Sequence, residues 1–269
     1  MINVFQAILL GVIQGATEFV PVSSSGHLVI VPWLLRWPEP GVAFDTMLHL
    51  GTLLAVVLVF WKELWSLARA GVRSVIARRI ETTEARLACW VLLATIPAAL
   101  MGIVLEHQFE ALFSTPPLVA VFLLATGIWL VLAERLGRRE RRAEDLHGWQ
   151  SLLVGVAQGL AIAPGISRSG TTMGAGMLLG LKRDEAARFS FLLSVPIILG
   201  TGLMQARKLL GSPDLGPQLL PVLFGFSAAF VTGYVCIRFL LSYLRDHSLS
   251  VFAVYCWMLG LLTLAVIVL

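Results

Sequence analysis

Long apolar segments separated by shorter polar ones dominate the chain. Six of the apolar segments are close to the ~20 residues that a helix needs to cross the ~30 Å hydrocarbon core of a bilayer. They cover residues 46–61, 87–105, 118–133, 189–206, 218–237 and 249–269. This pattern predicts an all-α polytopic membrane protein with six transmembrane helices.

Two further apolar stretches, residues 3–32 and 149–181, are interrupted near their centres by proline, serine and glycine. These residue types break helices. The second stretch lies between two basic segments, 134–147 and 182–188, and lysine and arginine concentrate on the cytoplasmic side of membrane proteins. It therefore has to enter and leave from the cytoplasm, which predicts a re-entrant helix–break–helix hairpin.

The charge distribution also orients the first stretch. The basic segment 62–86 places the end of span 46–61 in the cytoplasm, so this span starts outside and residues 3–32 form the same kind of hairpin from the outer face. Segment 106–117, which contains no lysine or arginine, is then an outer loop.

Each half of the chain thus consists of one hairpin and three spans. The halves cover approximately residues 1–133 and 148–269, joined by the basic cytoplasmic loop 134–147 within a single membrane domain, 1–269. Because three crossings invert the chain, the arrangement is an inverted-topology repeat. Membrane proteins of this kind place their sites at the repeat interface.

The two hairpins share a sequence motif around their breaks. Residues 11–27 read GVIQGATEFVPVSSSGH and residues 155–171 read GVAQGLAIAPGISRSGT, and the two align without a gap. The first copy contributes Glu18 and His27, whereas the second contributes Arg168. We therefore expect one site where the two tips meet, with an acid and an imidazole from one tip and a guanidinium from the other.

Hydroxyl groups and glycines at both tips indicate an anion site. Free N–H groups at a helix N-terminus, with serine hydroxyls beside them, bind phosphate groups. Arg168 adds a fork of donors that suits a phosphate or diphosphate, and Gln14 lies on the same helix face as Glu18, four residues away. The predicted substrate-binding residues are Gln14, Ser23, Ser25, Gly26, Ser167, Ser169, Gly170 and Thr172.

The predicted catalytic residues are Glu18, Ser24, His27 and Arg168. A carboxylate at membrane depth is by default functional, and Glu18 could be a general base, a metal ligand or a proton carrier. A base, a nucleophile and an oxyanion clamp suit hydrolysis of a phosphoryl ester or anhydride. The same residues could instead bind and carry a phosphorylated ligand. A structural protein without a ligand is disfavoured, because an unpaired arginine at the bilayer centre costs at least ~2.5 kcal/mol.

Composition agrees with a membrane protein: 58% of the residues are hydrophobic and 13% are charged, with a formal net charge of +4. The basic segments 62–86 and 134–147 are predicted to meet anionic lipid headgroups, not nucleic acid. Asp45 and His49, one turn apart at the start of the first span, are interpreted as lining an outer vestibule or as capping the helix.

The motifs QGATEFVPVSSSGH and PGISRSGTT, together with FSFLLSVP at 189–196, resemble those of bacterial undecaprenyl-diphosphate phosphatases of the bacitracin-resistance type. The resemblance covers essentially the whole chain. It implies hydrolysis of undecaprenyl diphosphate to undecaprenyl phosphate and inorganic phosphate, which recycles the carrier lipid of cell-wall synthesis. It also implies the bacterial inner membrane, a site facing the outer (periplasmic) side, and dependence on Mg²⁺ or Ca²⁺. The alternative function is a polyprenyl-phosphate transporter or flippase, and a homodimer is left open.

The resemblance also assigns roles to individual residues. The family's pair of acidic or amide residues falls on Gln14 and Glu18, and its serine, histidine and arginine fall on Ser24, His27 and Arg168. Its diphosphate-binding hydroxyls fall on Ser167, Ser169 and Thr172. Many members have glutamate where this chain has Gln14, so the resemblance leaves Glu18 as the one carboxylate ligand of a metal ion that the diphosphate also binds.

Overall fold

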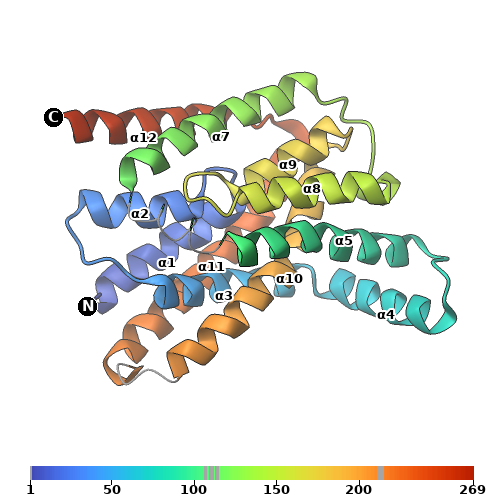
Figure 1. Ribbon diagram of the computed structural model, residues 1–269, viewed down its shortest axis with the longest axis horizontal. Coiled ribbons are helices and arrows are strands. Elements are labelled where there is room, and N and C mark those ends of the chain that lie inside the picture. Colours follow the sequence, from blue (N-terminus) through green and yellow to red (C-terminus); the bar gives the residue numbers. More distant parts are fainter. Residues whose placement is uncertain (1, 106–107, 109–111, 113–114, 211–214) are drawn as a thin grey trace.

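The computed structural model describes residues 2–105, 108, 112, 115–210 and 215–269. Apart from an isolated bridge between Arg141 and Leu181, the regular structure of this part of the chain is helical. The helices are α1 Val4–Phe19, α2 Ser24–Leu34, α3 Val42–Val59, α4 Trp61–Ala77, α5 Thr83–Val104, α7 Pro116–Leu136, η1 Ala143–Asp145, α8 Gly148–Leu160, α9 Arg168–Leu178, α10 Arg183–Leu210, α11 Leu215–Asp246 and α12 Ser250–Val268. They form an elongated bundle with both chain termini at the same end (Figure 1).

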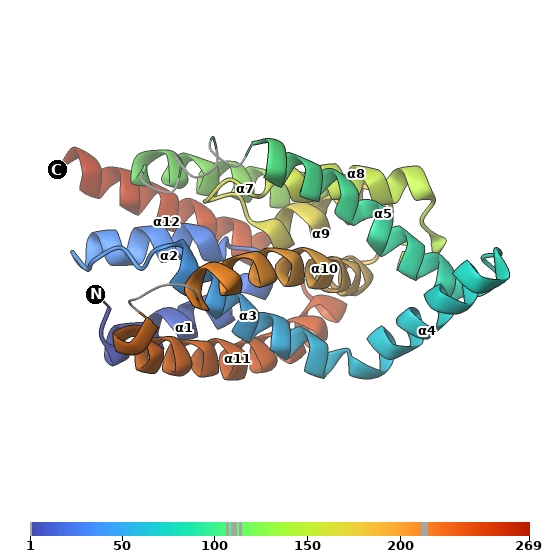
Figure 2. The same cartoon turned by 60° about the horizontal axis from the view of Figure 1, so that its bottom comes forward.

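Five helices in the described part of the chain are long and apolar enough to cross a membrane. They are α5, α7, α10, α11 and α12, and they fall on five of the six predicted spans. The sixth predicted span, 46–61, falls on α3, which meets the same criterion only together with α4, from which it is bent by 82°. Figure 2 shows α4 leaving α3 at the end of the bundle opposite the termini. The protein is therefore a polytopic helical membrane protein, although the outer loop predicted at 106–117 lies largely outside the described residues.

Both predicted helix breaks are present. Helix α1 ends at Phe19, just before Pro21, and α2 starts after Ser23, whose φ of 69° turns the chain. Helix α8 ends at Leu160, and α9 starts after Ser167. Each of the two serines accepts a hydrogen bond from an N–H group in the first turn of the helix that follows it, which starts a new helix at the break.

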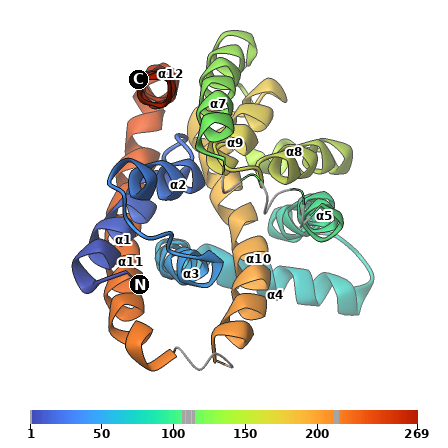
Figure 3. The same ribbon diagram turned by 60° about the vertical axis from the view of Figure 1, so that its left-hand side comes forward.

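The bundle packs the two broken helix pairs against different partners. Helix α1 packs along α11 and α8 packs along α5, while α3 and α10 lie side by side between them (Figure 3). Glycine lets α1 and α11 approach each other closely, because a Cβ atom on Gly15 of α1 would lie 2.6 Å from the carbonyl oxygen of Ala229 in α11. The aromatic core reaches the first break, where Phe19 meets the edge of Phe191 of α10 at a ring-centroid distance of 5.2 Å.

Partly buried ion pairs hold together the end of the bundle that carries α4. Glu134 at the end of α7 pairs with Arg139 and Arg183 and accepts a hydrogen bond from the N–H of Leu249 at 3.1 Å. Arg188 of α10 contacts three carboxylates, from α4, η1 and its own helix. These contacts fix the connection between α7 and α8 against three other elements.

Candidate active site

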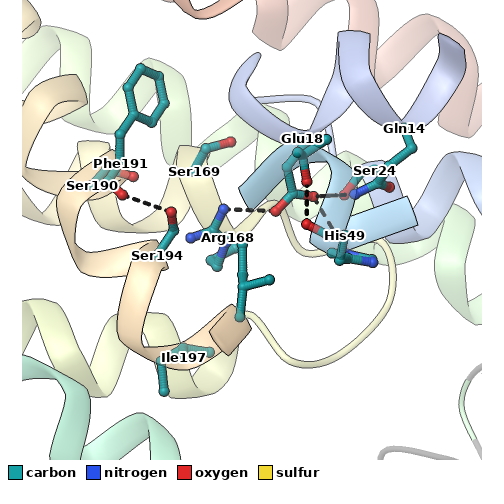
Figure 4. Close-up of polar contacts among 12 residues, drawn as sticks. Gln14, Glu18, Ser24, His49, Arg168, Ser169, Ser190, Phe191, Ser194 and Ile197 are labelled. Carbon is teal, nitrogen blue, oxygen red and sulfur yellow. Dashed lines mark hydrogen bonds and ion pairs between the residues drawn. The ribbon is translucent and has the colours of Figure 1, made fainter. Parts of the chain in front are cut away.

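Glu18 is the centre of a polar cluster at the break between α1 and α2, and the residue is only 4% exposed. Its Oε2 atom accepts hydrogen bonds from Ser24 Oγ at 2.6 Å and from Gln14 Nε2 at 2.9 Å. Its Oε1 atom forms an ion pair with Arg168 Nη2 at 2.7 Å. The carboxylate thus joins a hydroxyl and an amide from its own hairpin to the guanidinium of the other (Figure 4).

The two breaks touch each other directly. Ser169 Oγ donates to the carbonyl oxygen of Val20 at 3.2 Å, and the N–H of Gly165 donates to Ser23 Oγ at 3.2 Å. Gly26 lies so close to the second break that a Cβ atom on it would be 3.3 Å from the Cα atom of Gly165. The predicted meeting of the tips is therefore observed, and the first turns of α2 and α9 each lie beside the break of the other helix pair.

Several of the predicted hydroxyls hold the two breaks in shape. Ser23 Oγ accepts from the N–H of Gly26 at 3.2 Å, and Ser167 Oγ accepts from the N–H of Gly170 at 3.0 Å. The hydroxyl oxygens of Ser23 and Ser25 are 3.3 Å apart. These contacts turn each serine–glycine motif into a capped helix N-terminus, which is a favourable environment for an anion.

Arg168 keeps part of its hydrogen-bonding capacity free. Within the described part of the chain, its Nη1 atom is buried and has no hydrogen-bond partner, and the same is true of Gln14 Oε1. A buried donor without a partner among the protein groups is costly, so this nitrogen is available to a ligand. The free nitrogen can therefore donate a hydrogen bond to an anionic group.

Thr172 has a supporting position. Its hydroxyl donates to the carbonyl oxygen of Arg168 at 2.8 Å and lies 2.6 Å from the hydroxyl of Ser190 on α10. Ser194, one turn further along α10, donates to the carbonyl oxygen of Phe191 at 2.7 Å. Sequence reasoning gave Ser190 and Ser194 no role, although both belong to the FSFLLSVP segment.

His27 lies on the first turn of α2, but other groups occupy both of its ring nitrogens. Nδ1 contacts the carbonyl oxygen of Ser23 and Nε2 contacts the hydroxyl of Tyr255, each at 2.7 Å. The ring also stacks on Tyr255 at a centroid distance of 5.6 Å. The structure therefore connects His27 to α12 and not to the Glu18–Arg168 pair, and its catalytic role stays a prediction.

His49 is instead the histidine that faces Glu18. Its Nε2 atom lies 3.5 Å from Glu18 Oε2, and its Nδ1 atom lies 2.8 Å from the carbonyl oxygen of Asp45. Sequence reasoning placed His49 in a vestibule or a helix cap, because nothing in the local pattern of α3 indicates that this turn faces α1. The one available signal was the presence of a histidine within an apolar segment.

The arrangement around Glu18 does not provide a metal site made by protein groups alone. Within the described residues, no group of three or more histidine, cysteine or acidic side chains is placed to hold a metal ion. Both carboxylate oxygens of Glu18 already face N–H or O–H donors. A cation could bind here only if Glu18 gave up one of these donors or if the substrate supplied ligands.

Comparison with known proteins identifies the family. The sequence matches the family described as bacitracin resistance protein BacA over residues 7–262. It is 44% identical to an undecaprenyl-diphosphatase of Moorella thermoacetica over 264 residues, which cover 98% of each chain. It is 45% identical to one of Pelotomaculum thermopropionicum (99% of this chain, 97% of the relative) and 44% identical to one of Rubrobacter xylanophilus (100% of each). The chain belongs to the bacitracin resistance protein BacA family.

Proposed function

We propose that the protein is an undecaprenyl-diphosphate phosphatase, which hydrolyses the terminal phosphoric anhydride of this lipid to undecaprenyl phosphate and inorganic phosphate. The names of the full-length relatives support this function. The observation that carries it is the convergence of Ser24, Glu18 and Arg168 beside two helix N-termini. Hydrolysis of the lipid diphosphate recycles the carrier for cell-wall synthesis and accounts for bacitracin resistance.

Ser24 is the nucleophile favoured by the geometry. Its Oγ atom is already hydrogen-bonded to Glu18, the relation expected between a nucleophile and its base. In the proposed reaction, Oγ bonds to the terminal phosphorus, its proton passes to Glu18, and the bridging P–O bond breaks to release undecaprenyl phosphate. Water then cleaves the phosphoserine. The alternatives are direct attack by water or by His27, although His27 would first have to leave Tyr255.

Arg168 and the helix N-termini bind the phosphates in this account. The free Nη1 of Arg168 can donate to a phosphate oxygen, and first-turn N–H groups of α2 and α9 can add further donors. A divalent cation, Mg²⁺ or Ca²⁺, is proposed to enter with the diphosphate, since the protein offers it few ligands. The role of Glu18 as a ligand to that cation stays a prediction that requires Glu18 to release a donor.

We further propose six spans and two re-entrant hairpins arranged as an inverted repeat of residues 1–133 and 148–269 about the loop 134–147. Exchanging the halves converts the α1–α11 contact into α8–α5 and the α3–α11 contact into α10–α5. Helices α1, α2, α8 and α9 have 16, 11, 13 and 11 residues. At ~1.5 Å per residue, each is too short to cross ~30 Å of hydrocarbon alone.

The location follows from the same topology. Loop 134–147 and α4 lie at the end of the bundle that carries the basic segments, and this end is proposed to face the cytoplasm of a bacterial inner membrane. The site is proposed to open toward the outer face, with the lipid tail lying among the bilayer lipids. A homodimer and the lack of nucleic-acid binding stay predictions.

The rival function is a polyprenyl-phosphate transporter, since inverted repeats are common among transporters. The two are separated by phosphate release from undecaprenyl diphosphate by purified protein in detergent, where no transport can be measured. Release by the wild-type protein supports the phosphatase. Absence of release, together with movement of polyprenyl phosphate across vesicles containing the protein, would favour the transporter.

A further inference from the structure

We propose that His49 is a positioning residue that becomes the ionic partner of Glu18 when Arg168 turns toward the diphosphate. The inference rests on the proposed function, because it concerns binding of that substrate. It assigns a task to a side chain of α3, outside both hairpins.

Glu18 and the diphosphate compete for the guanidinium group of Arg168. In the structure its Nη2 atom is paired with Glu18, and its Nη1 atom is buried without a partner in the described part of the chain. A diphosphate carries more charge than a carboxylate and accepts two parallel hydrogen bonds from a guanidinium. Binding the substrate with both nitrogens would therefore take Arg168 from Glu18 and leave a carboxylate that is only 4% exposed without its cationic partner. A buried charge that loses its partner is strongly unfavourable.

His49 occupies the position from which this charge can be compensated. Its Nε2 atom lies 3.5 Å from Oε2, the oxygen of Glu18 that Arg168 does not use. Figure 4 shows the histidine and the arginine approaching the carboxylate from different sides. Because α3 carries His49 and α9 carries Arg168, a movement of Arg168 toward substrate leaves the His49–Glu18 contact in place.

The orientation of the His49 ring fits a cationic partner. Nδ1 faces the carbonyl oxygen of Asp45 at 2.8 Å, and Nε2 faces the Glu18 carboxylate. Both neighbours can only accept hydrogen bonds, so the environment matches a ring with a proton on each nitrogen. His27 differs, since its Nε2 contacts the hydroxyl of Tyr255, which can itself donate, and a neutral ring satisfies that arrangement.

The test is a double-mutant cycle in the purified full-length protein. The ligand is farnesyl methylenediphosphonate, in which carbon replaces the bridging oxygen so that it binds without being hydrolysed. Its dissociation constant is measured by calorimetry for the wild-type protein, His49→Leu, Glu18→Gln and the double variant. We expect His49→Leu to weaken binding about tenfold when Glu18 is present and by less than about twofold in the Glu18→Gln background, because the coupling acts through the carboxylate charge.

Two further variants complete the test. His49→Gln keeps an N–H donor near Glu18 without a charge and should weaken binding about threefold, which also provides a measurement if the leucine variant does not fold. His247→Leu, at an exposed position after α11, is the matched control and should bind as the wild type does. The role of His49 would be overturned if His49→Leu weakened binding equally with Glu18 and with Glu18→Gln, or weakened it in neither background. Either result would leave phosphate release by the wild-type protein, and so the proposed function, unaffected. A wild-type protein that neither binds the analogue nor releases phosphate would overturn the proposed function as well.

Discussion

Glu18 and Arg168 lie 150 positions apart in the sequence, yet Oε1 of one and Nη2 of the other are 2.7 Å apart. Each residue sits at the break of a different helix pair, so neither hairpin contains the site alone. With Ser24, the pair offers groups suited to phosphoryl transfer: a carboxylate next to a hydroxyl, and a guanidinium whose Nη1 atom has no hydrogen-bond partner among the described residues. The proposed catalytic arrangement therefore depends on how the two halves pack.

Ser24→Ala should abolish most of the activity, because it removes the group bonded to Glu18 Oε2. We expect kcat to fall at least ~100-fold, in the range for loss of a nucleophile or a positioned proton donor. The measurement is steady-state phosphate release from farnesyl diphosphate. Ser227→Ala, which removes a hydroxyl bonded to the Leu223 carbonyl on the exposed side of α11, should keep wild-type kinetics. A Ser24→Ala enzyme with kcat within a few-fold of wild type would favour direct attack by water.

Gly15→Ala should destabilise the protein, because its new Cβ atom would lie 2.6 Å from the Ala229 carbonyl oxygen and 2.7 Å from the Gly233 nitrogen. Backbone atoms cannot move aside cheaply, so a loss of about 1–3 kcal/mol is expected. Gly200→Ala is the matched control in a helix, because no atom of the described residues lies within 4 Å of the new atom. It should be neutral or gain up to ~1 kcal/mol from helix propensity. Thermal denaturation in detergent compares the two; equal midpoints would contradict the close packing of α1 on α11.

Glu134→Gln should lower stability while leaving the chemistry of the folded protein unchanged. The substitution removes the charge that holds Arg139 and Arg183 and weakens the acceptor for the Leu249 N–H. A loss of about 1–3 kcal/mol is expected for a partly buried network. Glu81→Gln serves as the control, because its 3.9 Å contact with Arg79 is exposed to solvent and such pairs contribute little. A Glu134→Gln protein that melts at the wild-type temperature would show that this network does not hold the connection.

Helix α4 should lie in the headgroup region of the membrane. Trp61, Trp65, Val75 and Ile76 are 59%, 56%, 79% and 78% exposed, and Arg69 and Arg73 flank this apolar stripe. Such helices insert their apolar face about 5–10 Å into the boundary between headgroups and acyl chains. A nitroxide attached to Val75→Cys, after replacement of the three native cysteines, should be more accessible to oxygen than to a water-soluble nickel complex. The opposite order would place this helix face in water.

The elements most accessible from the sequence were those set by local composition. The lengths of the apolar segments predicted the positions of α5, α7, α10, α11 and α12. Proline and serine within two further apolar stretches predicted the helix breaks after Phe19 and Leu160. The internal repeat correctly predicted that Glu18 and Arg168 lie close together, because the symmetry of the two hairpins relates positions far apart in the sequence. The departure of α4 from α3 at Phe60 was missed, since the apolar run ends there without proline or glycine.

The contacts that sequence reasoning missed all cross between distant helices. His49 on Glu18, Tyr255 on His27 and Ser190 on Thr172 depend on the rotation of α3, α12 and α10 about their own axes. In a helix that is apolar on nearly every side, periodicity does not define an inward face. The rotation is therefore fixed only by packing.

The most direct test of one site built from two hairpins is phosphate release from undecaprenyl diphosphate by the purified wild-type protein, Glu18→Gln, Arg168→Ala and the double variant. We predict that each single variant loses at least ~100-fold in kcat/KM. The double variant should lose little more than either, because the residues act as a unit. Thermal denaturation in detergent verifies that each variant is folded at the assay temperature, although Arg168→Ala should melt below the wild type because it leaves the buried Glu18 charge without this partner. A folded single variant that keeps kcat/KM within a few-fold of the wild type would contradict a site shared by the two hairpins.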